Sequence, residues 1–590
     1  MSLLDVAGLT VAYAGAAEPA VDRLDFSVRA GESLGLAGES GSGKTQTALA
    51  IMGLLPAHAR VEGKIFFDGR ALSGETPRVL NRFRARRLAM VFQDPQQALN
   101  PYLRVGEQLR RVLLEHRVVR TREARSRTLE LLRRVRLPDP ERQYRSYPHQ
   151  LSGGMRQRAM IAMALSCNPE LLIADEPTTA LDVTVQAQIL SLLKELRAET
   201  GIALLLITHD LGVIAENCER MLVMHRGRRL EEGSTAAVFA HPEQQVTKEM
   251  LAAARLTQGP PRVRLKSAAS VLRVEGLAVS FRDARSSWQP RRTRGALRHL
   301  SFALDAGETL AVVGESGCGK TSLARALVGL VPADHGRVYL SGRALASRLK
   351  DRPCEERREL QMVFQDPVAS LNPAMKIAQI IAEPVALHEP RSGPKARHER
   401  MVSALHRVGL EESLLQRFPH ELSGGQAQRV AIARALVLEP KVLVCDEAVA
   451  ALDGTVRRAV LELLMIEQKR SGLALVFIAH DLAVVRQISH RVLVMYTGRI
   501  SECADTVALF ERPRHPYTRA LIDSVPVADP ARAARPPPLA DELMAEEPSG
   551  CPFRLRCSFA LPICTEKLPA LRQIDRVEVA CHRAEELDLR

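Results

Sequence analysis

The stretch GESGSGKT spans residues 38–45 and continues a short apolar run, SLGLAG, at residues 33–38. The spacing G-x-x-x-x-G-K-T between a strand and a helix turns successive backbone N–H groups inward, where they can bind phosphate oxygens. A near copy, GESGCGKT, stands at residues 314–321. Two such stretches, each after an apolar run, argue against glycine-rich turns that bind nothing. We call them the first and the second cradle, and they predict two nucleotide-binding sites.

Each cradle offers a lysine, a threonine and a set of small residues to a nucleotide. Lys44 and Lys320 are expected to reach the outer phosphates, and the hydroxyls of Thr45 and Thr321 are expected to hold Mg²⁺. The remaining phosphate contacts are assigned to Gly38, Ser40, Gly41, Ser42 and Gly43 in the first cradle and to Gly314, Ser316, Gly317, Cys318 and Gly319 in the second.

Further motifs recur in the same order in both halves of the chain. They are VFQDP at 91–95 and 363–367, LSGGMRQR at 151–158 and LSGGQAQR at 422–429, LLIADE at 171–176 and VLVCDE at 442–447, and THD at 208–210 and AHD at 479–481. The cradles are offset by 276 residues (314 minus 38) and the LSGG motifs by 271 (422 minus 151). This regular offset indicates that one domain has been duplicated.

Hydrolysis of a nucleotide requires a metal ligand and a group that orients water. Asp175 and Asp446 end apolar strands, where a carboxylate can bind Mg²⁺. Glu176 and Glu447, one residue further, are expected to orient or deprotonate the attacking water. The other candidates are His209 and His480 as γ-phosphate partners, and Gln93 and Gln365 as residues that sense the metal and the water.

The pattern of elements predicts an α/β fold made of two tandem P-loop NTPase domains. Short apolar runs alternate with helical stretches, whereas the first thirty-odd residues and residues 61–68 alternate like an antiparallel sheet, and residues 100–150 favour a helical subdomain. The boundaries are placed at 1–254 for the first domain, 255–270 for a linker, 271–525 for the second domain and 526–590 for a small cysteine-rich C-terminal module.

Composition limits the possible environments of this chain. Its 590 residues exceed a single hydrophobic core, and it contains no run of about 18 uncharged apolar residues. The N-terminus lacks the pattern of a signal peptide, so a cytoplasmic protein is expected. The formal charge of +14 comes with arginines scattered over predicted helices and no basic stripe with aromatic residues, so we expect no nucleic-acid partner.

The complete motif set resembles the ATP-binding-cassette (ABC) ATPases. In that family two domains pair head to tail around two ATP molecules, so the resemblance implies an intramolecular pairing of the two halves. Ser423 and Gly425, with Gly424, would close over nucleotide at Lys44, and Ser152 and Gly154, with Gly153, would close over nucleotide at Lys320. Tyr13 and its counterpart Phe281 would stack on adenine.

A finer resemblance points to the dipeptide, oligopeptide and nickel importers. It rests on VFQDPQQALNP, VFQDPVASLNP, DEPTTALDVTVQAQIL and HPYTRAL. It implies an ATPase on the cytoplasmic face of the inner or plasma membrane, bound peripherally to two integral-membrane permeases that work with an extracytoplasmic substrate-binding protein. Peptides are the expected substrates, with nickel, glutathione and other small solutes as alternatives. A soluble twin-domain ATPase acting on ribosomes or DNA, and a scaffold without turnover, are the competing interpretations.

Two departures from the internal repeat concern chemistry. Ala448 and Val449 replace Pro177 and Thr178 beside the second glutamate, although both glutamates persist, so two competent sites are expected. At the C-terminus, Cys551, Cys557, Cys564 and Cys581 follow the spacing C-x5-C-x6-C-x16-C. Four thiolates can hold a [4Fe–4S] cluster or zinc, or remain unliganded. The resemblance to the peptide importers favours the iron–sulfur cluster, in a structural role.

Overall fold

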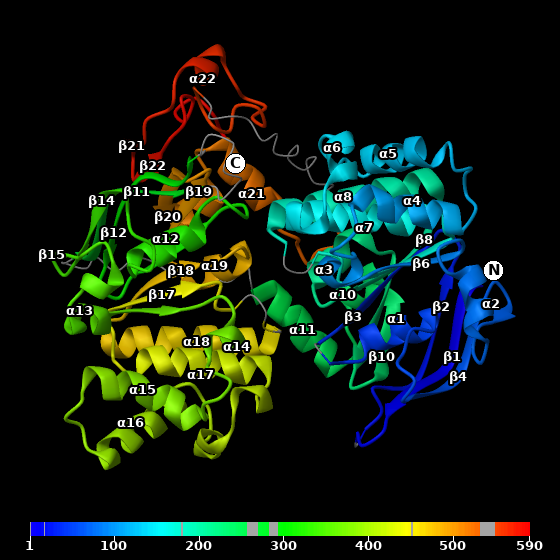
Figure 1. Ribbon diagram of the computed structural model, residues 1–590, viewed down its shortest axis with the longest axis horizontal. Coiled ribbons are helices and arrows are strands. Elements are labelled where there is room, and N and C mark those ends of the chain that lie inside the picture. The colour runs from blue at the N-terminus through cyan, green and yellow to red at the C-terminus, as the bar shows by residue number, and fades with distance from the viewer. Residues whose placement is uncertain are drawn as a thin grey trace. The chain divides into compact units, whose positions relative to one another are not determined.

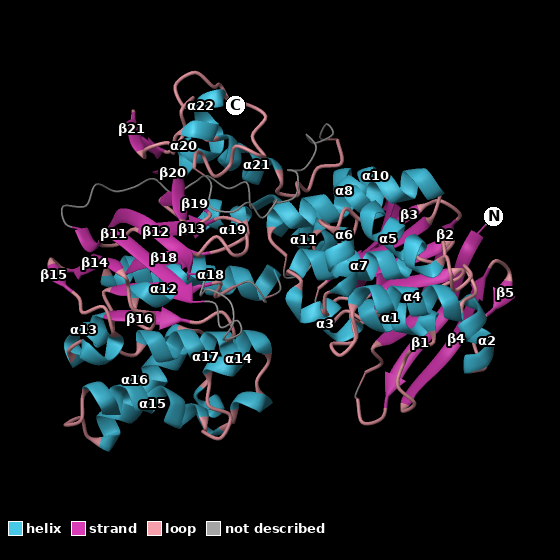
Figure 2. Ribbon diagram, turned by 45° about the horizontal axis from the view of Figure 1, so that its top comes forward, coloured by secondary structure: helices cyan, strands magenta, loops and turns pink. Residues whose placement is uncertain are grey.

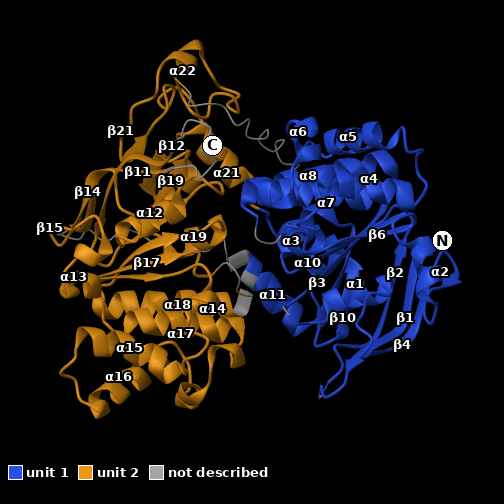
Figure 3. Cartoon of the chain, viewed as in Figure 1, with its two compact units in different colours: residues 1–256, 526–543 blue, residues 257–525, 544–590 orange. Residues whose placement is uncertain are grey.

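The computed structural model describes residues 2–589 apart from residues 17, 40, 179–180, 257–269, 283–292, 450–451, 453 and 532–548. The chain divides into two compact units (Figure 3). Unit 1 comprises residues 1–256 and 526–543, and unit 2 comprises residues 257–525 and 544–590. Each unit holds one cradle.

Unit 1 begins with an antiparallel sheet and continues through an α/β core (Figure 1). Its strands are β1 (Ser2–Tyr13), β2 (Val21–Arg29), β3 (Ser33–Gly38), β4 (Ala59–Phe67), β5 (Arg70–Ala71), β6 (Leu88–Val91), β7 (Leu171–Asp175), β8 (Ala203–Thr208), β9 (Arg220–His225) and β10 (Arg228–Ser234). Its helices are α1 (Lys44–Met52), α2 (Pro77–Phe83), α3 (Pro95–Ala98), α4 (Val105–Glu115), α5 (Ala124–Arg134), α6 (Pro140–Arg145), η1 (Pro148–Gln150), α7 (Gly153–Leu165), α8 (Val183–Thr200), α9 (Leu211–Asn217), α10 (Thr235–Ala240) and α11 (Gln245–Leu256).

Unit 2 repeats this order and adds a C-terminal segment. Its strands are β11 (Ser270–Arg282), β12 (Thr293–Asp305), β13 (Thr309–Val313), β14 (His335–Leu340), β15 (Arg343–Ala344), β16 (Leu360–Val363), β17 (Val442–Asp446), β18 (Ala474–Ile478), β19 (Arg491–Tyr496), β20 (Arg499–Asp505), β21 (Arg572–Ile574) and β22 (Val577–Val579). Its helices are α12 (Lys320–Leu327), η2 (Leu349–Asp351), α13 (Cys354–Glu359), α14 (Pro367–Ser370), α15 (Ile377–His388), α16 (Pro394–Arg407), η3 (Glu412–Gln416), η4 (Pro419–Glu421), α17 (Gly424–Leu436), α18 (Gly454–Ser471), α19 (Leu482–Ile488), α20 (Thr506–Glu511), α21 (Pro516–Asp523) and α22 (Pro562–Glu566).

A mostly parallel sheet forms the core of each unit. In unit 1 the strand order is β10-β9-β3-β8-β7-β6, and the β9–β10 pair is antiparallel. In unit 2 the order is β16-β17-β18-β13-β19-β20-β22-β21. The parallel strands are apolar along their length because helices cover both faces of such sheets (Figure 2). The predicted α/β core with an antiparallel subdomain and a helical subdomain is confirmed in both units.

Alternation along the core strands of unit 1 produces two hydrophobic layers. Leu34 and Leu36 of β3 pack on the side of α1 and the antiparallel subdomain, where Phe67 is fully buried. Ala37 at the end of β3 and Leu206 of β8 pack on the opposite side with α7 and the helical subdomain. The cradle between β3 and α1 is thereby fixed by packing on both sides.

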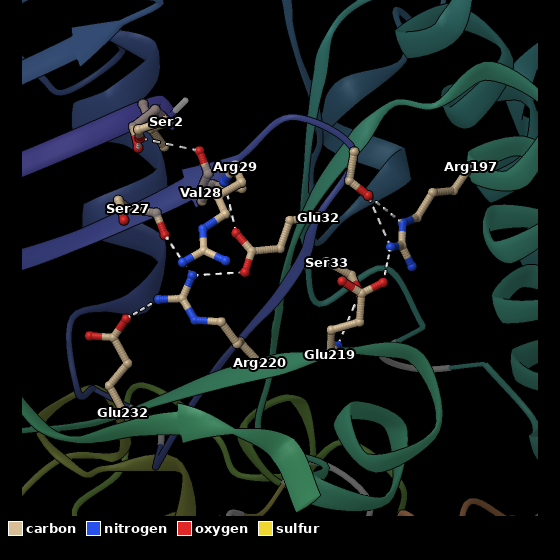
Figure 4. Close-up of polar contacts among 12 residues, drawn as sticks. Ser2, Ser27, Val28, Arg29, Glu32, Ser33, Arg197, Glu219, Arg220 and Glu232 are labelled. Atoms are coloured by element: carbon tan, nitrogen blue, oxygen red, sulfur yellow. Dashed lines mark hydrogen bonds and ion pairs between the residues drawn. The ribbon is translucent and has the colours of Figure 1, made fainter.

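An ion-pair network joins the antiparallel subdomain of unit 1 to its core sheet (Figure 4). Arg220 of β9 donates to the carbonyl of Ser27 at 3.4 Å and to Glu32 at 2.8 Å, and it also pairs with Glu232 of β10. In unit 2, Arg491 donates to the carbonyl of Ala303 at 3.1 Å, to Glu308 at 3.2 Å and to the sulfur of Cys503 at 3.4 Å. The arginine is therefore kept in both units, whereas one of its acidic partners is not.

Residues beyond 525 contribute to both units. Pro526–Ala531 belongs to unit 1, where the N–H of Val527 donates to Glu216 at 3.0 Å and Ala528 joins the hydrophobic core. The segment 549–589 belongs to unit 2, and its strand β22 pairs with β20 through Glu502 and Cys503. No helix among the described residues is long and apolar enough to span a membrane.

Glycine permits a close backbone contact that recurs in both antiparallel subdomains. Gly63 in β4 has φ of 93°, and a Cβ there would lie 2.4 Å from the carbonyl oxygen of Gly8 in β1. Gly336 in β14 has φ of 86° and would meet the carbonyl oxygen of Gly276 at 2.4 Å. The facing residues, Gly8 in β1 and Gly276 in β11, both lie where the register of the strand pair shifts. The irregular pairing of β1 and of β11 thus requires glycine at the facing position of β4 and of β14.

We expect Gly63→Ala to lower the free energy of opening of β1 and β4 by about 3 kcal/mol, because it adds a backbone clash to an unfavourable φ. Gly69→Ala is the matched control. Gly69 has φ of 74°, but a Cβ there would meet nothing within 4 Å. The control should cost about 1 kcal/mol. Hydrogen exchange of β1 and β4 peptides in the full chain measures the opening free energy of both variants. Equal destabilisation by Gly63→Ala and Gly69→Ala would show that the close contact of Gly63 with the Gly8 carbonyl does not matter.

Candidate functional site

Each cradle lies between the carboxyl end of a core strand and the start of a helix. Gly43 caps α1 with φ of 98°, and a Cβ there would lie 2.3 Å from the carbonyl oxygen of Ala20. Gly319 caps α12 with φ of 109° and would meet the carbonyl of Ala296 at 2.5 Å. Glycine is required at both positions, because the loop must turn and pass close to a neighbouring backbone.

The two lysines lie inside their loops. Lys44 is 5% exposed, and its Nζ donates to the carbonyls of Gly38 and Glu39, both at 2.8 Å. Burial lowers the pKa of Lys44 from its usual value. Lys320 is 6% exposed and donates to the carbonyls of Gly314 at 2.7 Å and Glu315 at 3.0 Å. Each amine is thus held close to the N–H groups that would contact phosphate.

An aspartate and a threonine face each other at each predicted metal position. Thr321 donates to Asp446 at 3.4 Å. In unit 1 the hydroxyl of Thr45 lies near Asp175 and acts to lower the pKa of that carboxyl, against the larger effect of burial. Burial raises the pKa of both aspartates to about 6. Among the described residues, the buried Oδ1 of Asp175 has no hydrogen-bond partner. A buried carboxylate oxygen without a donor suits a cation, so this pair fits Mg²⁺.

The predicted glutamate, glutamine and histidine converge in both units. In unit 1, Gln93 donates to Glu176 at 2.9 Å, and His209 Nδ1 lies 3.1 Å from the same carboxylate. These three residues follow β6, β7 and β8, which are adjacent in the sheet. The carboxylate is therefore held between a donor amide and an imidazole, beside Asp175.

The second unit repeats this contact set with a looser histidine. Gln365 donates to Glu447 at 2.7 Å, whereas His480 Nδ1 lies 3.9 Å from that carboxylate. The interaction with His480 is the largest of the effects that lower the pKa of Glu447. Ala448 and Val449, which follow Glu447, are buried. The substitutions next to the second glutamate therefore leave it within reach of its glutamine and histidine.

Both glutamates have an unusual backbone conformation that no sequence pattern indicated. Glu176 has φ of 45° and Glu447 has φ of 50°, a region that residues with a side chain rarely adopt. The N–H of Glu176 donates to Ile207 at 2.8 Å, and the N–H of Glu447 donates to Ile478 at 3.1 Å. The chain therefore bends directly after the strand, as strained residues at functional sites often do.

The serine–glycine turns begin the helices α7 and α17. Ser152 and Ser423 are the N-caps, and each hydroxyl accepts a hydrogen bond from a backbone N–H at 3.3 Å. Gln426 also accepts from the N–H of Ser423 at 3.0 Å and completes a capping box, whereas Met155 stands at the equivalent position in unit 1. This difference could be predicted from LSGGM against LSGGQ.

The third residue of each turn must be glycine for packing reasons. A Cβ at Gly154 would lie 2.5 Å from Val185 of α8, and a Cβ at Gly425 would lie 2.7 Å from Val456 of α18. The neighbours Gly153 and Gly424 are less crowded. That the serine–glycine turn of each unit closes over the nucleotide of the other unit stays a prediction.

The remaining predicted contacts surround the cradles. Tyr13 ends β1, donates its hydroxyl to Gln46 of α1 and lies beside His58 with ring centroids 5.7 Å apart. Phe281 is 47% exposed near the end of β11 and is thus accessible for stacking. Ser42 and Cys318 are buried under their loops, and Ser42 Oγ lacks a partner among the described residues. Gly41, Ser316 and Gly317 are exposed at the loop tips, and Ser40 lies outside the described residues.

The four C-terminal cysteines line one small cavity. Cys551, Cys557, Cys564 and Cys581 surround a space of about 20 Å³ together with Phe553 and other residues. All four are free thiols. The described part of the chain nevertheless contains no group of three or more His, Cys, Asp or Glu residues that could hold a metal ion. The four thiols thus line one cavity without forming such a group, and the expected iron–sulfur cluster stays a proposal.

Comparison with known proteins places these features in a family. Residues 21–179 and 297–450 match a model described as ABC transporter, and residues 501–564 match one described as Oligopeptide/dipeptide transporter, C-terminal region. The chain is 45% identical over 569 residues to the glutathione import ATP-binding protein GsiA of Pectobacterium atrosepticum, which covers 90% of this chain and 91% of that protein. It is 44% identical over 546 residues to the protein of that name from Escherichia coli (strain K12), which covers 87% of each.

We expect the double substitution Glu176→Gln/Glu447→Gln to reduce ATP turnover by about 100-fold or more, because a general base typically contributes that factor. Nucleotide binding should remain, since the cradles are unchanged. Phosphate release and equilibrium binding of a fluorescent ATP analogue measure the two effects. Glu199→Gln, on the exposed side of α8, is the control. Turnover close to that of the control would remove both glutamates from the reaction.

Proposed function

The chain belongs to the ABC transporter family, and from this premise we propose that its two nucleotide sites power the import of small peptides through separate membrane permeases. The predictions of an ABC ATPase and of its peptide-importing branch are confirmed by the family models and the relatives. The observation that carries the proposal is the union, in one chain, of two complete sets of nucleotide residues and a C-terminal region typical of oligopeptide transporters.

The residues of each unit can perform the steps of ATP hydrolysis. The cradle and its lysine would hold the phosphates, and the Thr45–Asp175 and Thr321–Asp446 pairs would hold Mg²⁺. Bound Mg²⁺ would neutralise charge on the phosphates. Glu176, held by Gln93 and His209, would accept a proton from the attacking water, and Glu447 would do so in unit 2.

We further propose that the two units pair within one chain. The serine–glycine turns carry a backbone N–H cluster at the start of a helix, which is a favourable position for phosphate. Each unit already has one such position in its own cradle. A second anion site is useful if Ser423 and Gly425 close over ATP at Lys44, and Ser152 and Gly154 close over ATP at Lys320.

The partners of the proposed importer are two integral-membrane permeases and, through them, an extracytoplasmic substrate-binding protein. The described helices include none long and apolar enough to cross a membrane. In this proposal the permeases supply the translocation path. The protein would act peripherally at the cytoplasmic face of the membrane. Glutathione is a tripeptide and is named for the relatives that are 45% and 44% identical, which makes it the first substrate to test.

The cysteine cavity supports the proposal of a [4Fe–4S] cluster. Four thiols from residues 551–581 surround one cavity, and cluster ligation takes four cysteines. The cluster would crosslink a segment whose strands β21 and β22 have only three residues each. We assign it a structural role, since the described residues around the cavity include no redox partner.

Uptake of labelled glutathione tests the transport proposal. Cells that produce this chain together with its proposed permeases and binding protein should accumulate glutathione or a dipeptide. Cells with Glu176→Gln/Glu447→Gln should not, because transport requires hydrolysis. Uptake of nickel without any peptide, or peptide uptake that persists in the double variant, would contradict the proposal.

Metal analysis tests the cluster. Protein purified without oxygen should be brown and contain about four irons per chain, and Cys564→Ser should lose most of the iron. Cys354→Ser is the matched control, because Cys354 lies in α13 outside the cavity and should leave the iron content unchanged. One zinc per chain, or an unchanged iron content in Cys564→Ser, would reject the cluster.

A further inference from the structure

Residues 549–589, which carry the four C-terminal cysteines and are called the cysteine segment, place an arginine in contact with the second cradle. Arg556 lies between Cys551 and Cys557, and its guanidinium forms two parallel hydrogen bonds with the carboxylate of Glu315, both of 2.7 Å. The side chains of Arg556 and Glu315 are only 5% and 11% exposed. A bidentate, buried pair of this kind is among the stronger polar contacts in proteins.

Aromatic rings surround this pair and hold the backbone of the loop. Tyr517 of α21 accepts a hydrogen bond from the N–H of Glu315 at 2.9 Å. Its ring packs on Tyr496 and Phe553, with centroids 4.6 and 5.4 Å away. Arg556 lies 5.9 Å from the Phe553 ring centroid and 6.0 Å from that of Tyr496. Glu315 is therefore fixed at both its carboxylate and its N–H.

The third polar group of Glu315 contacts the lysine of the cradle. Its carbonyl accepts a hydrogen bond from Lys320 at 3.0 Å. The position of the Glu315 peptide consequently influences where the lysine that contacts phosphate can lie. An unpaired carboxylate at this place would also repel the phosphates of ATP, since like charges in a poorly hydrated site interact strongly.

The residues that supply these two supports are not repeated in the sequence of the first half. Glu39 occupies the position of Glu315, but the motif HPYTR at 515–519 corresponds to HPEQQ at 241–245, so Glu243 replaces the tyrosine. The cysteine segment follows the second domain only and has no copy in residues 1–256. The contact thus distinguishes two sites whose catalytic residues are otherwise alike.

We propose that Arg556 is a positioning residue for the second nucleotide site: the cysteine segment neutralises Glu315 and fixes its peptide, so that ATP affinity at the second cradle, and not at the first, depends on this segment. The inference goes beyond the transport function. It holds whether the four cysteines bind iron, zinc or nothing, because it rests on Arg556 and its contacts.

Two variants of the full chain allow ATP binding to be measured at one cradle at a time. Lys44→Ala leaves the second cradle for ATP, and Lys320→Ala leaves the first. In the Lys44→Ala background, Arg556→Ala should weaken binding of a fluorescent ATP analogue with Mg²⁺ by about tenfold, as expected when a buried charge loses its partner. In the Lys320→Ala background the dissociation constant should not change. An unchanged second site, or equal losses at both sites, would overturn the proposal.

Further variants separate positioning from loss of folding. Arg554→Ala is the matched control, since Arg554 belongs to the same segment and donates to the carbonyl of Cys551 at 3.3 Å. Adding Glu315→Gln to Arg556→Ala should restore most of the affinity, because it removes the unpaired charge. Arg556→Lys should be intermediate, as lysine keeps the charge without the bidentate geometry. If Arg556→Ala/Glu315→Gln binds ATP as weakly as Arg556→Ala, then neutralisation of Glu315 is not the role of Arg556.

If Arg556→Ala unfolds the segment, Tyr517→Phe keeps the aromatic ring and removes only the oxygen that accepts from Glu315. It should weaken ATP binding at the second cradle by about threefold and leave the first unchanged. Hydrogen exchange at residues 314–321 should become faster in this variant, a readout that does not depend on turnover. Exchange and affinity both equal to the parent protein would overturn the proposal.

Discussion

The close passage of the cradle backbone past its neighbours is the constraint on which both sites depend. A Cβ at Gly38 would lie 2.5 Å from the carbonyl oxygen of Met224, and one at Gly314 would lie 2.2 Å from that of Met495. Because β3 and β13 are buried on both faces, the loop cannot move away from the strand beside it. The lysine, the metal-binding pair and the glutamate are then placed by neighbouring strand ends of one rigid sheet.

Duplication preserved the chemistry and let the supporting contacts diverge. Gln93 and Gln365 hold their glutamates at 2.9 and 2.7 Å. Around this common centre, Glu232 of the ion-pair network corresponds to Cys503, and the capping box of Gln426 is absent where Met155 stands. The two sites thus have the same catalytic groups but different supporting contacts, which gives a physical basis for unequal rates of ATP hydrolysis.

Local patterns allowed the cradles, the buried strands and the converging glutamates to be predicted, because each depends on residues close in sequence or on the end of a strand. The positive φ of Glu176 could not be predicted, since it follows from packing around the strand end. Arg556 and Glu315 are separated by 241 residues, and the segment that carries Arg556 is not repeated in the sequence of the first half, so neither spacing nor internal repetition revealed their contact. Contacts of this kind depend on tertiary structure alone.

The use of residues beyond 525 by both units has a consequence for biosynthesis. Ala528 completes the core of unit 1, and β22 extends the sheet of unit 2 beside β20. During translation the ribosome therefore releases residues 1–256 of unit 1 well before Ala528, one of their packing partners, emerges. Unit 1 can reach its final set of contacts only after residues 257–525, which make up most of unit 2, have been translated, so the folding of the first half is completed by a segment made after the second half.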